Sequence, residues 1–232
     1  MKILIKIILF LILVIIVTPI LLSKYFFSGK PRDLGVTYTQ ADYTQSHDKI
    51  ETQVTSVPLS ESVSAADTLQ FSGRKDVDIS LNSSEITAYI NSDKYIYAPL
   101  SQVQIKINPD GTGEASGIIN LKNFLTYISL TTPVNEVQKA IDKFHISSNP
   151  PFYAQGTLRV IDNQVSFDIQ KLEVGHILVP QGSVSENLGA LNDYASKRLN
   201  SIPNLQVRSL TLSNSQVNLD ATVPEIVKKV EK

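Results

Sequence analysis

The chain has 232 residues, with 21 lysines and arginines against 22 aspartates and glutamates, and it contains no cysteine. A net charge of −1 excludes the strong basic character that attracts proteins to nucleic acid. The lack of cysteine excludes disulfides, thiolate metal sites and cysteine catalysis. The length is sufficient for one β-containing domain with its own core.

The first segment of the chain is strongly apolar. No charged residue occurs from 7 to 23, and the helical length of this stretch approaches the ~30 Å of a bilayer core. A cleaved signal normally ends in small residues, whereas the first alanine of this chain is Ala41. The sequence therefore predicts a retained transmembrane signal-anchor helix over 1–27. Its expected membrane contacts are Ile7, Leu11, Val14, Pro19, Leu22, Tyr25, Phe26 and Phe27.

Such an anchor predicts a single-pass protein of the cell membrane. We expect the bulk of the chain to be extracytoplasmic, because a short basic N-terminus before an apolar run is the arrangement of an export signal. Basic residues also follow the run, and their number alone favours the opposite orientation. After the anchor, we expect a polar tether over 28–45 and an extracytoplasmic domain over 46–232 in a bacterial envelope.

Three β-hairpins are predicted from apolar residues that alternate on both sides of turn residues. The first turns at "NPDGTG", residues 108–113, between "VQIKI" and "EASGIINL". The second turns at Asp162 and Asn163, and the third turns at 213–215. In the third hairpin the apolar phase slips between Val207 and Leu210, which indicates a β-bulge.

A helix is expected before each hairpin. Asn82 to Glu85 resembles a helix cap, Thr132 with Pro133 begins a second apolar stripe that runs to Phe144, and Ser183 to Glu186 begins a third. A further short helix is expected in "TQADYTQSHDKI", residues 39–50. The predicted fold class is therefore α+β. It consists of an N-terminal transmembrane helix followed by a curved, mainly antiparallel β-sheet with helices packed on one face.

The sequence offers no clear catalytic or metal constellation. The turn from Asn108 matches part of a calcium-loop pattern, but its twelfth position is Ile119 instead of glutamate, so a plain hairpin turn is the better interpretation. The three histidines, at 47, 145 and 176, lack the spacing of metal ligands. We expect no enzyme activity, no catalytic residue, no metal and no cofactor.

Two apolar stretches require an explanation beyond the regular elements. Residues 118–130, "IINLKNFLTYISL", show neither a strand nor a helix period, and "ILVP" follows at 177–180. In one interpretation, 118–130 is core covered by other elements. In the other, it lines a groove for an acyl chain, and 177–180 faces the membrane. The expected groove residues are Ile119, Leu121, Phe124, Leu125, Tyr127, Ile128, Phe144 and Phe152, and the expected membrane-facing loop is Ile177, Leu178, Val179 and Pro180.

The order of these segments resembles a known group of proteins. "LNSSEITAYIN", "INPDGTGEASGIINL" and "LQVRSLTLSNSQVNLDATVP" together resemble small membrane-anchored bacterial proteins of the tubular lipid-binding (TULIP) and AsmA-like kind. The likeness extends over most of 70–224 and includes no diagnostic motif, so it transfers no site residue. It implies a curved sheet that encloses an apolar groove for lipid, without covalent chemistry.

The function predicted from these features is membrane-tethered, non-enzymatic binding of lipid or another long apolar ligand at the outer face of the cytoplasmic membrane. The partners would be the lipid bilayer and a lipid ligand, with no nucleic acid. The alternative is an envelope protein–protein interaction or scaffolding module without a ligand cavity, whose partners would be envelope proteins.

Overall fold

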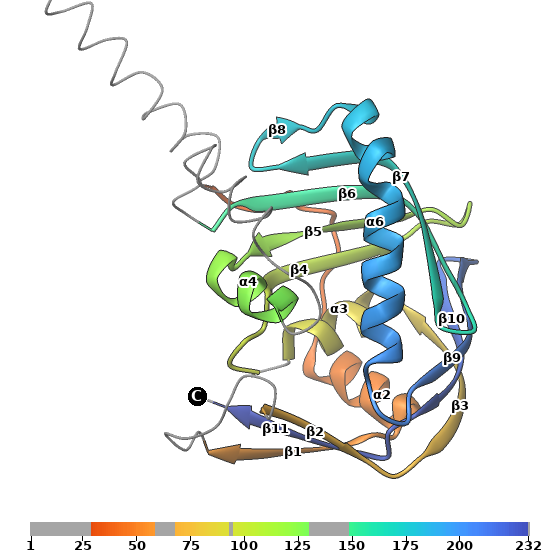
Figure 1. The fold of residues 1–232 in the computed structure, drawn as a ribbon. Coiled ribbons are helices and arrows are strands. Elements are labelled where there is room, and N and C mark those ends of the chain that lie inside the picture. Colours follow the sequence, from red (N-terminus) through yellow and green to blue (C-terminus); the bar gives the residue numbers. More distant parts are fainter. Residues whose placement is uncertain (1–28, 59–67, 93–94, 130–148, 232) are drawn as a thin grey trace, which may run out of the picture.

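A computed structural model describes residues 29–58, 68–92, 95–129 and 149–231. The strands are β1 (Gln53–Pro58), β2 (Leu69–Ser72), β3 (Lys75–Asn82), β4 (Leu100–Ile107), β5 (Gly113–Ile119), β6 (Pro151–Ile161), β7 (Gln164–Val174), β8 (Ile177–Leu178), β9 (Gln206–Ser213), β10 (Gln216–Val223) and β11 (Ile226–Glu231). The helices are α2 (Gln40–Ile50), α3 (Ser83–Ser92), α4 (Leu121–Ser129) and α6 (Gln181–Asn200). Figure 1 shows their arrangement.

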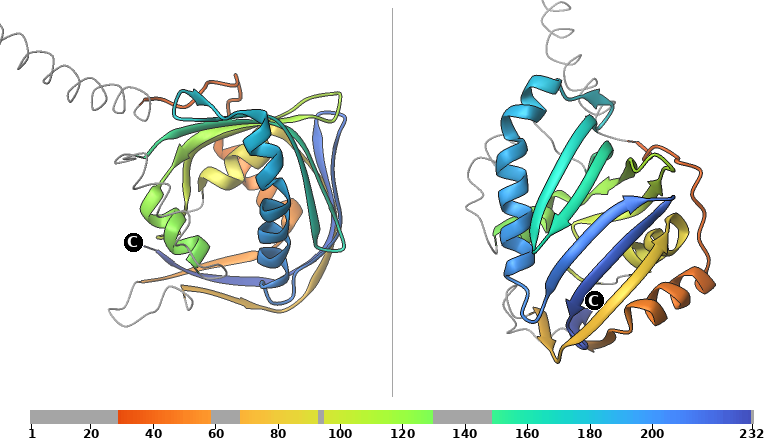
Figure 2. Two further views of the ribbon diagram at one scale, coloured as in Figure 1. Left: turned by 45° about the horizontal axis from the view of Figure 1, so that its top comes forward. Right: turned by 90° about the vertical axis from the view of Figure 1, so that its right-hand side faces the viewer.

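The strands form two sheets. The larger has the order β3-β10-β9-β6-β5-β4, with β7 and then β8 beside β6, and the smaller has the order β1-β11-β2. On one side of β6 lies β7, and on the other side lie β5, opposite residues 151–156, and then β9, opposite residues 160 and 161. The large sheet therefore forks at β6, where β5 and β9 diverge. Figure 2 shows it curving around α3 and α6.

The three predicted hairpins are confirmed as β4–β5, β6–β7 and β9–β10, all antiparallel. Asp162 and Asn163 in the second turn, and Asn214 and Ser215 in the third, have positive φ values, as two-residue hairpin turns with the strand twist require. The predicted bulge is confirmed too. Asp220 pairs with Ser209 while its neighbour pairs with Val207, so one residue of β9 is unpaired.

The cap predicted for α3 is confirmed. Asn82 Oδ1 accepts a 2.9 Å hydrogen bond from the Glu85 backbone N–H, and Glu85 Oε2 accepts one of 2.9 Å from the Asn82 N–H. The short helix expected at 39–50 is α2, which Thr39 and Asp42 cap in the same reciprocal way. The cap expected at Ser183 is wrong, because α6 begins at Gln181 after Pro180, without a side-chain cap. The helix expected at 132–144 lies outside the described residues.

Helix α3 lies along the outer edge of β4 and satisfies its backbone groups. Ser83 Oγ and Thr87 Oγ1 each accept a 2.9 Å hydrogen bond from the backbone N–H groups of Ile107 and Ile105. Asn91 bonds both backbone groups of Val103, at 2.6 and 2.9 Å. The three side chains recur every fourth residue, so they share one helix face. This face replaces a further strand and blocks edge pairing.

Helix α6 covers the edge of β7 in a similar way. Ser196 Oγ accepts a 2.8 Å hydrogen bond from the Val165 N–H, and Asn192 Oδ1 accepts one of 3.0 Å from the Phe167 N–H. Nearer the helix start, Gln181 Nε2 donates to the Ile169 carbonyl at 2.8 Å. The free edges of β4 and β7 are therefore each held by a polar helix face.

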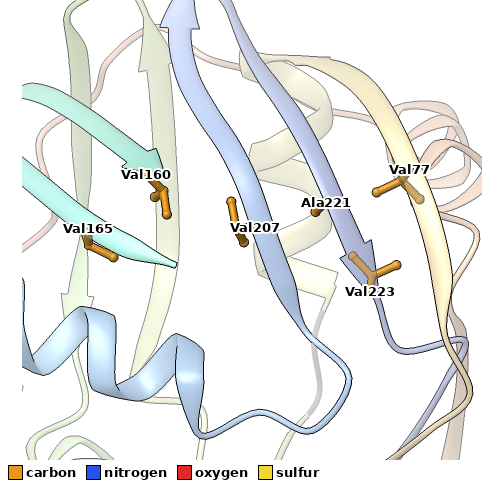
Figure 3. Close-up of a cluster of buried hydrophobic side chains, with 6 residues drawn as sticks. All are labelled: Val77, Val160, Val165, Val207, Ala221 and Val223. Carbon is orange, nitrogen blue, oxygen red and sulfur yellow. The ribbon is translucent and has the colours of Figure 1, made fainter. Parts of the chain in front are cut away.

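The main hydrophobic core lies where β6, β7, β9, β10 and β3 meet (Figure 3). Its buried members are Val77, Val160, Val165, Val207, Ala221 and Val223. Ala195 and Leu199, from the C-terminal half of α6, pack against this cluster. Val184, near the start of α6, is also buried, whereas Leu191 in the middle of the helix stays 39% exposed.

The expected α+β fold class is wrong, because the structure is mainly β. Strands hold 46% of the described residues and helices 29%, whereas strands hold ~20–25% of an average soluble protein. The helices were expected to form a layer on one face of the sheet. Instead, α3 and α6 each follow one strand edge through polar side chains, and the large sheet curves around them.

The single-pass membrane localisation, and with it the membrane, transmembrane-helix and signal-anchor assignments, is corrected as well. In the described parts of the chain, none of the helices combines the length and the apolar character needed to cross a membrane. Helix α6 is the longest with 20 residues, but it carries Glu186, Asp193, Lys197 and Arg198, which a bilayer interior disfavours. The residues named for the anchor, within 1–27, lie outside the described residues.

Candidate ligand-binding site

Small residues lie side by side at the centre of the concave face of the large sheet. Ala115 of β5 is opposite Ala154 of β6, and two residues further along Gly113 is opposite Gly156. Because successive side chains of a strand point to opposite faces, these four residues share one face. On the outer side of β5, β4 adds Ile105 and Ile107 to the same face. On this face the side chains are therefore short along β5 and β6 and longer on the neighbouring strand β4.

A cavity of about 360 Å³ lies over these small residues. Small-molecule sites usually measure ~300–1,000 Å³ and are mostly apolar. The side chains of its wall come from six strands and two helices. The apolar ones are Ile86 and Ile90 of α3, Ile105 and Ile107 of β4, Ala115 of β5, Ala154 and Leu158 of β6, Phe167 and Ile169 of β7, Leu191 of α6, Leu210 and Leu212 of β9, and Val217 of β10.

The cavity opens between the two helices. Of its lining residues, Ile90 of α3 and Leu191 of α6 are the most exposed, at 36% and 39%. Large aliphatic side chains on an amphipathic helix normally face the core. Here they flank the opening of a cavity, so this apolar surface is available to a ligand.

The polar residues of the lining are Glu114, Gln155 and Thr157. Glu114 is paired with Gln155 across the two strands, and strand alternation turns their side chains to the convex face. There, the Tyr153 hydroxyl donates a 2.8 Å hydrogen bond to Glu114 Oε2. The polar groups of the lining are thus directed away from the cavity, which presents hydrocarbon to an occupant.

A polar network on the convex face holds the strands below the cavity in place. The Arg32 guanidinium lies 3.8 Å from the ring centroid of Tyr153 and donates hydrogen bonds of 2.9 and 2.8 Å to the two oxygens of Glu173. Leu34 donates its N–H to Gln104 Oε1 at 2.6 Å. Residues 32–34 therefore tie β4, β6 and β7 together across the back of the sheet.

This network shifts the acid–base properties of its members. Burial, followed by the hydrogen bond to the Glu114 carboxylate, raises the pKa of Tyr153 to about 12. Burial acts to raise the pKa of Glu114, but hydrogen bonds from Tyr153 and Asn108 and the charge of Lys106 outweigh it and keep that pKa below its usual value. A neutral tyrosine and an ionised glutamate form a stable donor–acceptor pair, not a proton-transfer pair.

The groove residues expected from the sequence lie beside this cavity and do not line it. Ile119 and Phe152 are half-buried and share the concave face, one step nearer the start of β6, where the Phe152 ring covers Gly117. Leu121, Phe124 and Leu125 are half-buried in α4. Tyr127 and Ile128 belong to α4, but their side chains, like Phe144 as a whole, lie outside the described residues.

The loop expected to face a membrane is the segment that joins β7 to α6. Ile177 and Leu178 form β8 and are 42% and 57% exposed, Val179 is half-buried, and Pro180 is exposed directly before α6. None of the four lines the cavity.

Sequence inspection missed the wall of the cavity, although a signal was present. Ala115 and Ala154 place two small side chains opposite each other on one face of neighbouring strands, where a packed core would have large ones. The expected groove residues were instead chosen because they are large and apolar. A deficit of side-chain volume was the better indicator of a hollow.

Within the described ranges, no group of three or more His, Cys, Asp or Glu side chains is arranged to hold a metal ion. Comparison with protein-family models, with curated proteins and with solved structures finds no match. The resemblance to tubular lipid-binding proteins therefore stays a prediction.

Proposed function

We propose that this protein binds a long apolar molecule, such as the acyl chain of a lipid, in the concave cavity and carries out no covalent chemistry there. The observation that supports this proposal is the 360 Å³ space lined by aliphatic side chains from α3, α6 and the forked sheet. Transfer of a methylene group from water to such surroundings contributes ~0.8 kcal/mol. A chain that fills the cavity therefore needs no polar anchor to bind.

The same geometry argues against catalysis at this site. A catalytic centre brings together polar groups that converge on a reacting atom. The carboxylate of Glu114 instead bonds Tyr153 at 2.8 Å on the convex side, and the side chains that face the cavity are hydrocarbon.

The experiment is a fluorescence titration of the purified full chain with parinaric acid, a linear fatty acid that fluoresces strongly only when shielded from water. We expect saturable binding to the wild type and a loss of at least about tenfold in affinity for Leu191→Glu, because a charge at the opening must be desolvated when a chain enters. The matched control is Leu178→Glu, which adds the same charge at an exposed leucine outside the lining.

Both substituted positions are solvent-exposed, so neither variant should lose its fold, which circular dichroism would verify. The proposal is contradicted if the wild type shows no saturable signal, or if the two glutamate variants bind equally well. In those cases the interaction-module alternative would be the better starting point.

A further inference from the structure

We infer that the cavity selects its ligand by chain length: it accepts one unbranched hydrocarbon chain, tail first, and leaves the head group outside between α3 and α6. This inference rests on the proposed function and specifies the class of ligand. Long-chain alcohols, fatty acids and their esters would therefore compete for the same site according to the length of the chain.

The inner end of the cavity is closed. Ile107 and Val217 are each only 5% exposed, in contrast to the two side chains at the opening. Between them, Leu212 of β9 packs closely against the turn of the β4–β5 hairpin and closes the gap of the fork. A Cβ added to Gly113 would lie 3.0 Å from Leu212 Cδ1, and one added to Gly111 would lie 3.0 Å from the Leu212 carbonyl oxygen. A chain that enters from the opening must stop at this seal.

The side toward the C-terminal end of β6 is closed by the core. Leu158, Phe167 and Leu210 line the cavity and also pack against the buried valine cluster. Because a packed core is not displaced without a large loss of free energy, the chain cannot extend in that direction. The length of chain that fits is fixed by the distance from the opening to the seal.

The width of the cavity suits one chain. Ala115 and Ala154 form the floor as a directly opposed pair, and Ile105 of β4 lies opposite Ala115. On the other side, β7 adds Ile169 and Phe167 further along, opposite Gly156 and Leu158. An unbranched chain can lie over two methyl groups between such walls. A branched chain or a fused ring system would contact the isoleucine and phenylalanine side chains first.

The lining gives no means of recognising a charged head group. It contains no Lys, Arg or His among the described residues, and its single carboxylate is engaged with Tyr153. Burial of a charge without a partner is costly. The head group therefore stays in solvent, and selection depends on the hydrocarbon.

The test is competition against bound parinaric acid by a series of unbranched primary alcohols from hexanol to tetradecanol, with the full chain. Affinity should rise about fourfold for each added methylene until the cavity is full, and then stop rising.

The decisive variant is Ala154→Leu, which adds three carbons to the floor. It should reach its plateau about three carbons earlier than the wild type, because the added side chain takes up that part of the cavity and close-packed surroundings cannot make room for it. Ala190→Leu, at an exposed α6 position outside the lining, is the matched control and should leave the plateau unchanged.

Circular dichroism and retained saturable binding of parinaric acid show that Ala154→Leu is folded, so a misfolded variant cannot imitate the expected result. A head-group comparison completes the test: the alcohol and the carboxylate of equal chain length should differ by less than the effect of one methylene. The inference is overturned if affinity rises without a plateau, if the plateau does not move in Ala154→Leu, or if a branched or polycyclic hydrocarbon binds more tightly than the straight chain. Failure of the proposed function is distinct, because then neither parinaric acid nor any alcohol binds.

Discussion

Lys49 Nζ lies 2.6 and 2.8 Å from the two carboxylate oxygens of Glu85, a side chain that is only 2% exposed. The ammonium group also donates to the Ser80 carbonyl at 2.9 Å. This pair joins α2 to the start of α3 and to the outer edge of β3. Since Glu85 also caps α3 through the Asn82 N–H, one carboxylate supports both the helix that flanks the cavity and its attachment to the N-terminal segment.

Lys49→Met should lower the free energy of unfolding by about 2 kcal/mol. The change leaves a buried carboxylate without its cation, and the partial exposure of Lys49 reduces the loss from the ~3–5 kcal/mol of a fully buried pair. Urea denaturation measures the change. Lys49→Met combined with Glu85→Gln should recover part of the loss, because no charge is then buried. Lys197→Met, at an exposed position in α6, should have little effect.

Ser196→Ala should detach α6 from β7 locally. The Val165 N–H, which donates to Ser196 Oγ at 2.8 Å in a buried position, would have no acceptor, at a cost of about 1–3 kcal/mol. Hydrogen exchange should be faster at the Val165 amide than in the wild type. The matched substitution Ser185→Ala removes an exposed hydroxyl from the same helix and should leave that exchange rate unchanged. Equal protection of the Val165 amide in both variants would contradict a stabilising role for its hydrogen bond to Ser196 Oγ.

Gly156→Ala should be strongly destabilising, by more than about 3 kcal/mol. Gly156 lies at the register shift between β6 and β7, and a Cβ there would collide with the backbone carbonyl of Asp168, which cannot rotate away. Gly189→Ala provides the contrast. It lies in α6 with no atom near an added Cβ, so it should stabilise the protein by about 1 kcal/mol through helix propensity. Thermal unfolding of the two variants should shift in opposite directions.

Ionisation of Tyr153 should lower the free energy of unfolding at alkaline pH. Its pKa is raised from 10.0 to about 12, chiefly by burial, so the folded state holds a proton that the unfolded state releases. The corresponding stabilisation is fully present below pH 10 and is lost as pH rises through the folded value. Denaturation midpoints measured across this range should decline less steeply in Tyr153→Phe. Tyr38→Phe, at a position 46% exposed, should follow the wild type.

The local elements were well predicted because their signals are local. Alternation around Asp162 and Asn163 specifies a hairpin, and the reciprocal bonds of Asn82 and Glu85 require residues only three apart. The bulge in β9 could be found because one unpaired residue reverses the apolar phase, which is visible in the sequence itself.

The arrangement of these elements could not be predicted in the same way. That Ser83, Thr87 and Asn91 would bond the edge of β4 requires knowledge of which strand is an edge, and their spacing is also that of an ordinary exposed helix face. The cavity depends on pairs such as Ala115 with Ala154, which are 39 residues apart. The ligand groove was predicted at the large apolar residues of 118–130, although the cavity lies over the small side chains of Ala115 and Ala154.

The small sheet has a consequence for the order of folding. Its central strand, β11, follows all the other described strands in the chain, yet β1 pairs with it in parallel and β2 pairs with it on the other side. Neither early strand can pair until β11 has been synthesised, because β2 needs residues 226–229 and β1 needs residues 226–231. During synthesis, the backbone groups of β1 and β2 that bond β11 therefore stay unpaired. At that stage the ribosome-bound chain is exposed to proteases and to wrong strand pairing.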